Sequence, residues 1–564
     1  MRLLFKLITL IVILCLPAAA GYVFYKRVLK PNPIPHAPPT ASERATLILQ
    51  KQHSRYLLGT NTNELREDNA SIPFIDLFKS SIPFPDTHPW LSSKGVVYDK
   101  DGWPVDLKGG VAGTKFLNRL PAGTVPDGLY TVLYEGAGEL QYGNDARLVS
   151  RQPDKDIIEI KAGKDQILNA SLIIKSINAS NPLRNIKVLL PGGICEGNPY
   201  RRVDSNTACG KQRYLSFDQH HAQLLFNPDY LNFMKDFRVI RFMNMAGMTR
   251  NPVEQWSARN TLDKSTWAGK EGTRGAPLEV MVALANRLQA DAWFSMPHRA
   301  SDDYIREFSS YAAKHLNPSL KVYVEYSNEV WNNIFIHKKY AIEQGLIRNL
   351  DTDPQTAGIK FYAKRSVEVF KLWENTFGGT QRLLRTLSGW SANERLTSQL
   401  LSYEQTHRYT DVFAIAPYFY ALPKELRKAS TVDDIFELML DKGSNYGLSA
   451  SIEQMQTQVE LANEFGVELV AYEGGQHLVD WETRTVEAHP NPLLYAANRD
   501  PRMGELYGRY LSAWKASGAK VFVHFSAPRI YSWYGSWGAK EYISQPREQA
   551  PKYDALLNYL EANR

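Results

Sequence analysis

The sequence predicts an α/β fold, a (β/α)8 TIM barrel that is interrupted after its first strand by a small antiparallel β-sandwich. Three observations lead to this prediction. First, short apolar runs of the length of a strand recur along the chain. Second, amphipathic stretches of helical period, such as residues 278–288 and 452–462, lie between the apolar runs that follow residue 192. Third, residues 95–192 instead alternate apolar and polar side chains. At 564 residues the chain exceeds one ordinary domain, since a barrel takes about 250 residues.

The apolar runs supply one strand candidate before the alternating segment and seven after it. Eight strands are the number that closes this kind of barrel. The expected barrel strands are residues 56–63, 237–243, 291–296, 321–325, 382–387, 411–416, 468–472 and 520–525.

The segment between the first and second barrel strands has the pattern of an antiparallel sheet. Its short runs, for example residues 129–134, 157–160 and 186–190, alternate apolar and polar side chains and are separated by Gly, Asn, Asp and Pro. We therefore expect a first barrel part at residues 51–94, an inserted β-sandwich at 95–192 and the remaining barrel at 193–564.

The N-terminus predicts export. Residues 7–25 form an apolar run of 19 with basic residues on both sides, which is long enough to cross a bilayer as a helix. Residues 18–20 (AAA) also fit a signal-peptide cleavage site, so residues 1–30 are either an uncleaved membrane anchor or a removable signal peptide. Residues 31–50 follow as a Pro-rich linker. We expect a periplasmic or cell-surface protein.

Charge and motifs exclude several function classes. The formal net charge is +7, but five of these positive charges lie in the first 30 residues, which leaves +2 for the rest. A nearly neutral body does not indicate a nucleic-acid partner. The sequence also has no phosphate-binding glycine loop and no zinc-spaced Cys/His set. We therefore predict no metal and no cofactor.

Two cysteines lie close together in a Gly/Asn/Pro-rich region of the exported part. Cys195 and Cys209 are 14 residues apart in the sequence. Export to an oxidising compartment favours a disulfide between them, and two free thiols are the alternative.

Two glutamates end predicted strands. Glu329 follows the strand expected at 321–325, and Glu473 follows the strand expected at 468–472. Side chains at the carboxyl ends of barrel strands point into one shared mouth, and hydrolysis of a glycosidic bond requires two carboxyl groups that meet across it. A helix-capping carboxylate is the alternative role for Glu329. Glu325 lies earlier in its strand, so we interpret it as structural.

The motif around Glu329 resembles clan A of the glycoside hydrolases. Residues 325–332 read EYSNEVWN, and Glu473 follows Glu329 after 144 residues. The resemblance implies that Glu329 is the acid/base after strand four and that Glu473 is the nucleophile after strand seven. It also implies retention of anomeric configuration.

The same resemblance assigns supporting residues. Asn328 is similar to the residue that hydrogen-bonds the sugar 2-hydroxyl, and Arg241 to a strand-two arginine that supports the nucleophile. A buried structural ion pair is the alternative for Arg241. Tyr418 matches the tyrosine that holds the nucleophile ionised. Relatives often carry His where this chain has Ala416, which leaves Tyr420 as a second candidate.

Aromatic residues and one histidine complete the expected substrate site. Sugar rings stack on aromatic side chains, and several tryptophans follow predicted strands. His298 follows the third strand and is expected to line the subsite. The tryptophans expected to form platforms are Trp331, Trp533 and Trp537, with Trp390 and Trp481 in similar positions.

Together these features predict a retaining glycoside hydrolase that acts on a polysaccharide or oligosaccharide, with a β-linkage favoured. Two alternatives remain at this point. The first is a non-catalytic carbohydrate-binding protein on the same barrel, and the second is a transglycosylase, in which a sugar hydroxyl replaces water as the acceptor.

Overall fold

The computed structural model describes residues 57–563. The predicted signal peptide or anchor at 1–30, the linker at 31–50 and the start of the first barrel part at 51–56 lie outside the described residues.

Eight parallel strands close into a barrel in chain order, as the sequence predicts. Each strand pairs with the next, and β19 returns to pair with β1, with Leu58 opposite Phe522. All eight predicted strands are confirmed, with ends that differ by a few residues. The barrel strands are β1 (Leu57–Asn61), β13 (Val239–Arg241), β14 (Asp291–Met296), β15 (Val322–Tyr326), β16 (Leu383–Ser388), β17 (Val412–Ile415), β18 (Glu468–Ala471) and β19 (Val521–His524).

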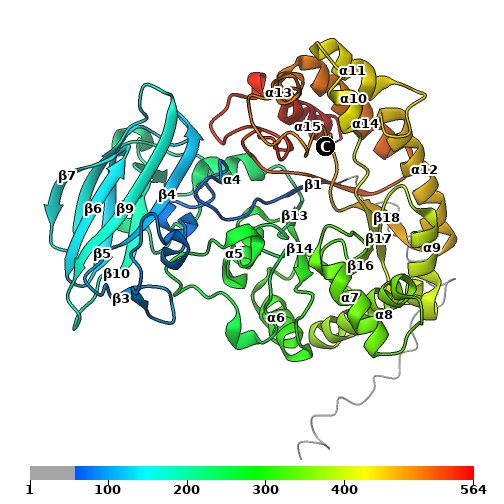
Figure 1. The fold of residues 1–564 in the computed structure, drawn as a ribbon, viewed down its shortest axis with the longest axis horizontal. Helices are drawn as coiled ribbons and strands as arrows, with labels where there is room; N and C mark the ends of the chain where they lie inside the picture. The colour runs from blue at the N-terminus through cyan, green and yellow to red at the C-terminus, as the bar shows by residue number, and fades with distance from the viewer. Residues whose placement is uncertain (1–56, 564) are drawn as a thin grey trace, which may run out of the picture.

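Helices surround the barrel strands (Figure 1). The two predicted amphipathic stretches are helical: residues 278–288 are α5, and residues 452–462 lie within α12. The helices are α3 (Phe217–His220), α4 (Pro228–Met234), α5 (Leu278–Leu288), α6 (Asp302–His315), α7 (Ile336–Ile347), α8 (Pro354–Phe377), α9 (Glu394–Ser402), α10 (Pro423–Leu426), α11 (Val432–Leu440), α12 (Leu448–Glu464), α13 (Asn491–Arg499), α14 (Pro501–Ala516) and α15 (Pro551–Ala562).

The barrel interior has its own small core. Alternate residues of each strand point inward, as the period of two requires. In β15, Tyr323 belongs to this inner cluster, whereas Val322 and Val324 pack outward against the main core. Glu325 shares the inward face with Tyr323. The carboxylate of Glu325 is therefore inside the barrel, which agrees with its predicted structural role.

Four antiparallel sheets lie between β1 and β13 in the sequence, and two of them, β2-β3 and β11-β12, have only two strands. Of the two larger sheets, one has the order β10-β5-β8-β7 and the other the order β4-β9-β6. Figure 1 shows them at one end of the molecule, beside the barrel. Asp76, after β1, accepts a hydrogen bond from the backbone N–H of Val188 in β10 (2.9 Å) and so ties the sheets to the barrel. The strands of this segment are β2 (Val97–Tyr98), β3 (Pro104–Asp106), β4 (Ala112–Pro121), β5 (Gly128–Glu135), β6 (Gly138–Asn144), β7 (Ala146–Gln152), β8 (Lys155–Ile160), β9 (Ile167–Ile177), β10 (Arg184–Leu189), β11 (Gly193–Cys195) and β12 (Tyr214–Ser216).

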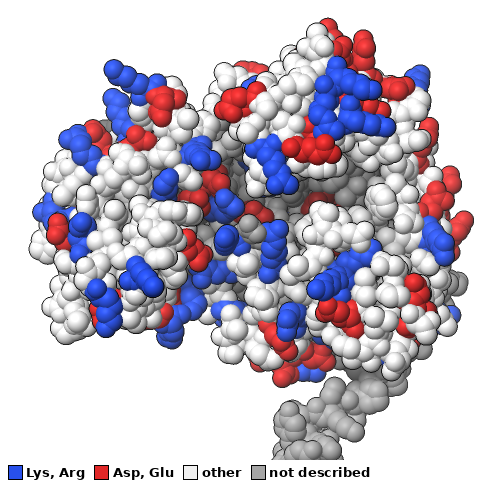
Figure 2. Space-filling view, in the orientation of Figure 1, with Lys and Arg blue, Asp and Glu red and all other residues white. Residues whose placement is uncertain are grey.

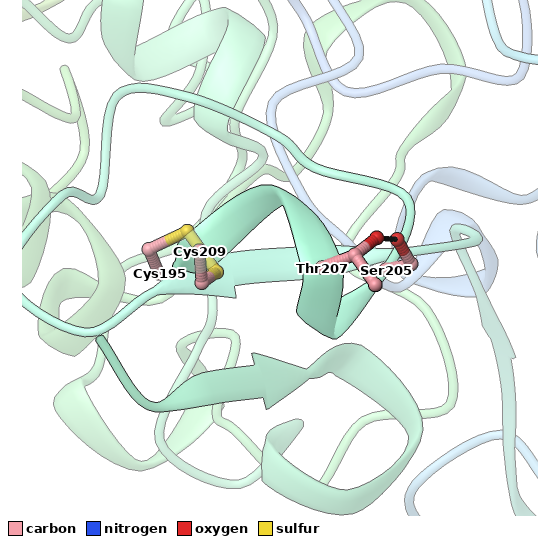
Figure 3. Close-up of a disulfide and its surroundings, with 4 residues drawn as sticks. All are labelled: Cys195, Ser205, Thr207 and Cys209. Carbon is pink, nitrogen blue, oxygen red and sulfur yellow. Dashed lines mark hydrogen bonds between the residues drawn. A yellow bond between two sulfur atoms is a disulfide. The ribbon is translucent and has the colours of Figure 1, made fainter. Parts of the chain in front are cut away.

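The predicted disulfide between Cys195 and Cys209 is present (Figure 3). The two Cα atoms are 5.3 Å apart. Cys195 ends β11, and Cys209 ends a short 3-10 helix at Asn206–Cys209. The bond therefore fixes the loop through which the chain passes from the inserted sheets back to the barrel.

Residues 57–563 include no helix with the length and apolar character needed to cross a bilayer. On the face drawn in Figure 2, basic and acidic side chains are interspersed.

Candidate active site

Glu329 and Glu473 line one cavity at the carboxyl ends of the barrel strands. Glu329 lies three residues after β15, and Glu473 lies two residues after β18. Two strands separate β15 from β18 in the barrel, so their ends face each other across the mouth. The cavity has a volume of about 1150 Å³, and both carboxyl groups contribute to its wall.

The turn after β15 holds Glu329 in a strained backbone conformation. Ser327 and Glu329 have φ angles of 62° and 44°, in the left-handed region that side chains other than glycine rarely adopt. Asn332 closes the turn, because its backbone N–H donates to the Glu329 carbonyl (2.8 Å) and its side chain donates to Glu329 Oε2 (2.7 Å). The strain fixes the direction in which the carboxyl group enters the cavity.

The two glycines after Glu473 are required by close packing. A Cβ atom on Gly474 would lie 2.5 Å from the Phe522 ring. Gly475 has a φ of 134°, and a Cβ there would lie 2.4 Å from the hydroxyl of Tyr507. Only glycine fits at positions 474 and 475, because any side chain there would collide with Phe522 or Tyr507. The Gly-Gly pair therefore allows the backbone path that positions Glu473.

Arg241, at the end of β13, is fully buried and binds four acceptors around the barrel. Its Nη1 donates to Glu473 Oε1 (2.8 Å) and to Asn61 Oδ1 (3.2 Å). Its Nη2 donates to Glu325 Oε2 and to Asn328 Oδ1, both at 3.0 Å. Arg241 thus forms ion pairs with both Glu473 and Glu325, so the contact expected from the resemblance and the structural ion pair given as its alternative are both present.

Glu325 anchors the far side of this guanidinium group. Its Oε2 also accepts hydrogen bonds from Trp293 Nε1 (3.0 Å) and Ser295 Oγ (2.9 Å), both from β14. Glu325 does not line the cavity. It balances the buried charge of Arg241 from inside the barrel.

Two tyrosines donate to the two cavity carboxylates, one to each. The Tyr418 hydroxyl donates to Glu473 Oε2 (3.0 Å), and the Tyr472 hydroxyl donates to Glu329 Oε1 (2.6 Å). Tyr420 instead packs against Tyr446, with ring centroids 5.2 Å apart and ring planes tilted by 36°. Of the two candidates that the sequence left open, Tyr418 is therefore the tyrosine that hydrogen-bonds Glu473.

Burial raises the pKa of both carboxyl groups. The pKa of Glu473 rises to about 7 because of burial, against the opposing effect of Arg241 and with a further upward contribution from Glu329. Burial also raises the pKa of Glu329, whose direct donors, Tyr472 and Asn332, are neutral. A cation in contact favours the ionised form of Glu473, whereas Glu329 lacks such a contact and is better suited to carry a proton.

Parallel tryptophans form the wall on the Glu329 side of the cavity. The rings of Trp331 and Trp390 are parallel, with centroids 6.0 Å apart. Trp390 is 48% exposed, and Trp481, at 54%, lies on the same cavity. Flat aromatic surfaces of this kind bind the C–H faces of sugar rings.

Trp537 and His477 form the wall on the Glu473 side. The indole N–H of Trp537 donates to His477 Nδ1 (3.1 Å), so the histidine carries its proton on Nε2. Burial lowers the pKa of His477 to about 4, which keeps the ring neutral. Both residues line the cavity, and the His477 ring lies 5.5 Å from that of Tyr418.

Two predicted substrate contacts are not at the cavity. His298 does not line it; the ring is buried against His337 and Tyr340, because the chain after β14 turns into the helical layer. Trp533 stacks on Tyr534, with centroids 3.7 Å apart, and also lies outside the cavity wall. The cavity wall therefore gives no support to the predicted sugar contacts of His298 and Trp533.

Sequence reasoning missed three residues that the barrel brings to the site: Tyr472, His477 and Asn61. Tyr472 and His477 flank Glu473 in the sequence, and an inspection of that segment for hydrogen-bond donors could have found them. Asn61 ends β1, is fully buried and donates to the Tyr472 carbonyl (2.9 Å). Across residues 57–563, no group of three or more His, Cys, Asp or Glu side chains is arranged to hold a metal ion.

The sequence matches no protein-family model and no curated protein. Among solved structures it is similar to a 4-O-alpha-L-rhamnosyl-beta-D-glucuronidase from Fusarium oxysporum (14% identity, TM-score 0.36, covering 56% of this chain and 60% of that chain). It is also similar to a double mutant of a Cellulomonas fimi endo-beta-1,4-mannanase (10%, 0.34, 57% and 63%) and to a family 51 alpha-L-arabinofuranosidase from Bifidobacterium longum (12%, 0.37, 59% and 66%). The chain thus spans less than two thirds of the length of the first two enzymes. The fold assignment rests on the strand order of the barrel itself.

Replacing Arg241 with Met should destabilise the protein strongly. The change leaves Glu325 and Glu473 buried without their shared cation, and breaking one buried pair alone costs about 3–5 kcal/mol. Urea denaturation measures the loss. The control is Arg147→Met, which breaks an exposed pair with Glu159 and should cost less than about 1 kcal/mol. Equal stability of the two variants would contradict the role of Arg241.

Proposed function

We propose that the protein is a retaining glycoside hydrolase that cleaves a polysaccharide or oligosaccharide, with Glu329 as acid/base and Glu473 as nucleophile. The observation that carries this proposal is the asymmetric pair at the cavity. Glu473 contacts a cation and a tyrosine hydroxyl through its two oxygens, whereas Glu329, at the opposing strand end, has only neutral donors. One group is held for attack and the other for proton transfer.

In the first step, Glu473 Oε attacks the anomeric carbon while Glu329 gives its proton to the leaving glycosidic oxygen. The C–O bond to the leaving sugar breaks, and a glycosyl ester with Glu473 forms. As Glu473 loses its negative charge to the ester bond, the pKa of Glu329 falls to suit its second role. Asn328, whose Oδ1 accepts a hydrogen bond from Arg241, binds the sugar 2-hydroxyl in this proposal.

In the second step, Glu329 acts as a base. It takes a proton from water, and the water oxygen attacks the anomeric carbon and releases Glu473 as a carboxylate. Two inversions at one carbon give net retention. Attack by a sugar hydroxyl in place of water would give transglycosylation by the same route.

We also propose that residues 95–192 form the predicted β-sandwich and that the protein is exported. The disulfide supports export, because such bonds persist in oxidising compartments.

Glu329→Ala should lose turnover of substrates with poor leaving groups but retain cleavage of aryl glycosides with activated leaving groups, because these need no proton. Azide should restore the second step and yield a glycosyl azide of the same anomeric configuration as the substrate. Proton NMR of the product measures this configuration. Equal losses on both substrates without azide rescue, or an inverted product, would contradict the assignment.

Glu473 should be labelled covalently by a 2-fluoro sugar with an activated leaving group. Fluorine slows both steps, and the good leaving group keeps the first fast enough for the ester to accumulate. Peptide mass spectrometry should place the label on residues 471–475, and Glu473→Gln should abolish labelling and turnover with the fold intact. Labelling of another carboxylate would move the nucleophile. Binding without any labelling would favour a non-catalytic carbohydrate-binding protein.

The acidic limb of kcat/KM should move to lower pH in Glu329→Gln. Glu473 must be ionised to attack, its pKa is raised to about 7, and the neighbouring carboxylate contributes to that rise. Removing the carboxylate lowers the pKa of Glu473, so activity persists to lower pH. The assay uses an activated aryl glycoside, and the control is Glu394→Gln, an exposed carboxyl group at the cavity edge. An unmoved or raised limb would refute this coupling.

A further inference from the structure

The cavity wall contains a guanidinium group that no acidic residue neutralises. Arg529 lines the cavity and is half-buried. Within residues 57–563, no carboxylate forms an ion pair with it, and its guanidinium carbon lies over the ring of Trp537, 5.5 Å from the centroid. The buried arginines Arg241 and Arg385 are paired with acidic residues. The half-buried arginines Arg274 and Arg382 have no ion pair with a described residue, but each donates to a backbone carbonyl.

The backbone around Arg529 is fixed on both sides. Asn63, after β1, donates to the carbonyl of Pro528 (2.7 Å), and the N–H of Arg529 donates to the carbonyl of Lys540 (2.9 Å). The side chain therefore leaves a rigid loop and lies over a ring whose own N–H is bound to His477. A positioned cation of this kind is ready to bind an anion at little cost in conformational entropy.

Arg529 lies on the side of the cavity that would hold the sugar attacked by Glu473. Contacts lead from Arg529 to Trp537, from Trp537 to His477 and from His477 to Tyr418, which donates to the nucleophile. The nucleophile binds the anomeric carbon of the sugar that stays, whereas Glu329 serves the sugar that leaves. Arg529 is thus near the retained part of the chain.

The cavity wall also carries three further carboxylates, Glu64, Glu394 and Glu453, and one lysine, Lys338, so its net charge does not attract anions. Selectivity must come from a local, directed contact. A guanidinium group donates two parallel N–H bonds to the two oxygens of a carboxylate, which matches its planar geometry. His477 adds a neutral Nε2–H donor on the same wall.

We propose that Arg529, together with Trp537 and His477, forms a subsite for a sugar that carries a carboxylate, so that the substrate is a glycan containing uronic acid. The inference rests on the proposed glycoside hydrolase function and names its substrate class. The guanidinium group of Arg529 donates one hydrogen bond to each oxygen of the sugar carboxylate. Trp537 stacks on the sugar ring, and His477 donates to a hydroxyl group of that ring.

Binding to the Glu473→Gln protein tests the subsite without turnover. The probes are tetrasaccharides of β-1,4-linked glucuronate, β-1,4-linked mannuronate and α-1,4-linked galacturonate, each compared with its carboxyl-reduced, neutral counterpart by calorimetry. At least one uronate should bind about tenfold or more tightly than its neutral counterpart, since charge-assisted hydrogen bonds contribute about 1.5–3 kcal/mol. This preference should weaken as salt concentration rises.

Adding Arg529→Gln should reduce the preference to within about twofold while neutral probes bind as before, because the Trp537 ring remains. Arg529→Lys should retain part of it through charge alone. The matched control is Arg499→Gln. Like Arg529, Arg499 lies over an aromatic ring, that of Tyr531, but it pairs with Glu541 and does not line the cavity. This variant should keep the full preference.

Equal affinity for charged and neutral probes would overturn the inference. A preference for uronates that survives Arg529→Gln would overturn it as well. So would the failure of every uronate to bind at millimolar concentration. Failure of the hydrolase proposal is seen separately, by fluorosugar labelling of the wild-type protein. A protein that shows the Arg529-dependent preference but is never labelled would keep the subsite and lose the hydrolase assignment.

Discussion

The buried guanidinium group of Arg241 is the contact on which the rest of the site depends. A cation removed from water needs acceptors for its donors, and here the acceptors are Glu473, Glu325, Asn328 and Asn61. They come from three different barrel strands, β1, β15 and β18, or the turns that follow them. Satisfying one charge therefore orients the nucleophile candidate, the residue beside the acid candidate and the end of β1 at once. The closed barrel makes this possible, because only there do the ends of so many strands converge on one side chain.

The chemistry proposed for this site requires conditions that oppose stability. Two carboxyl groups are buried near each other, and Ser327 and Glu329 adopt left-handed backbone angles. The surrounding structure offsets these costs. Asn332 closes the strained turn, and the close packing of Gly474 against Phe522 fixes the end of β18. The strain and the raised pKa values are then available to the chemistry, because the scaffold cannot relax to remove them.

The cavity is divided by chemistry into two walls. On the Glu329 side, Trp331 and Trp390 offer parallel aromatic faces without a charge between them. On the Glu473 side, Trp537 and His477 accompany the guanidinium group of Arg529. This difference gives the retained and leaving parts of a glycan different requirements. In the function proposed above, stacking on Trp331 and Trp390 acts on one side, and stacking together with carboxylate binding by Arg529 acts on the other.

Local patterns in the sequence predicted the barrel, its eight strands and the placement of Glu329 and Glu473 at strand ends, and the spacing of Cys195 and Cys209 favoured their pairing. Each depends on periodicity or spacing within a short window, where burial imposes a period of two or 3.6. Only the tertiary structure decided that Tyr418 reaches Glu473, that Tyr472 reaches Glu329 and that His298 and Trp533 lie away from the cavity. These outcomes depend on side chains far apart in the sequence, such as Arg241 and Glu473, which are separated by 232 residues. Their meeting is set by how the strands close and how the loops turn, and no local pattern encodes that geometry.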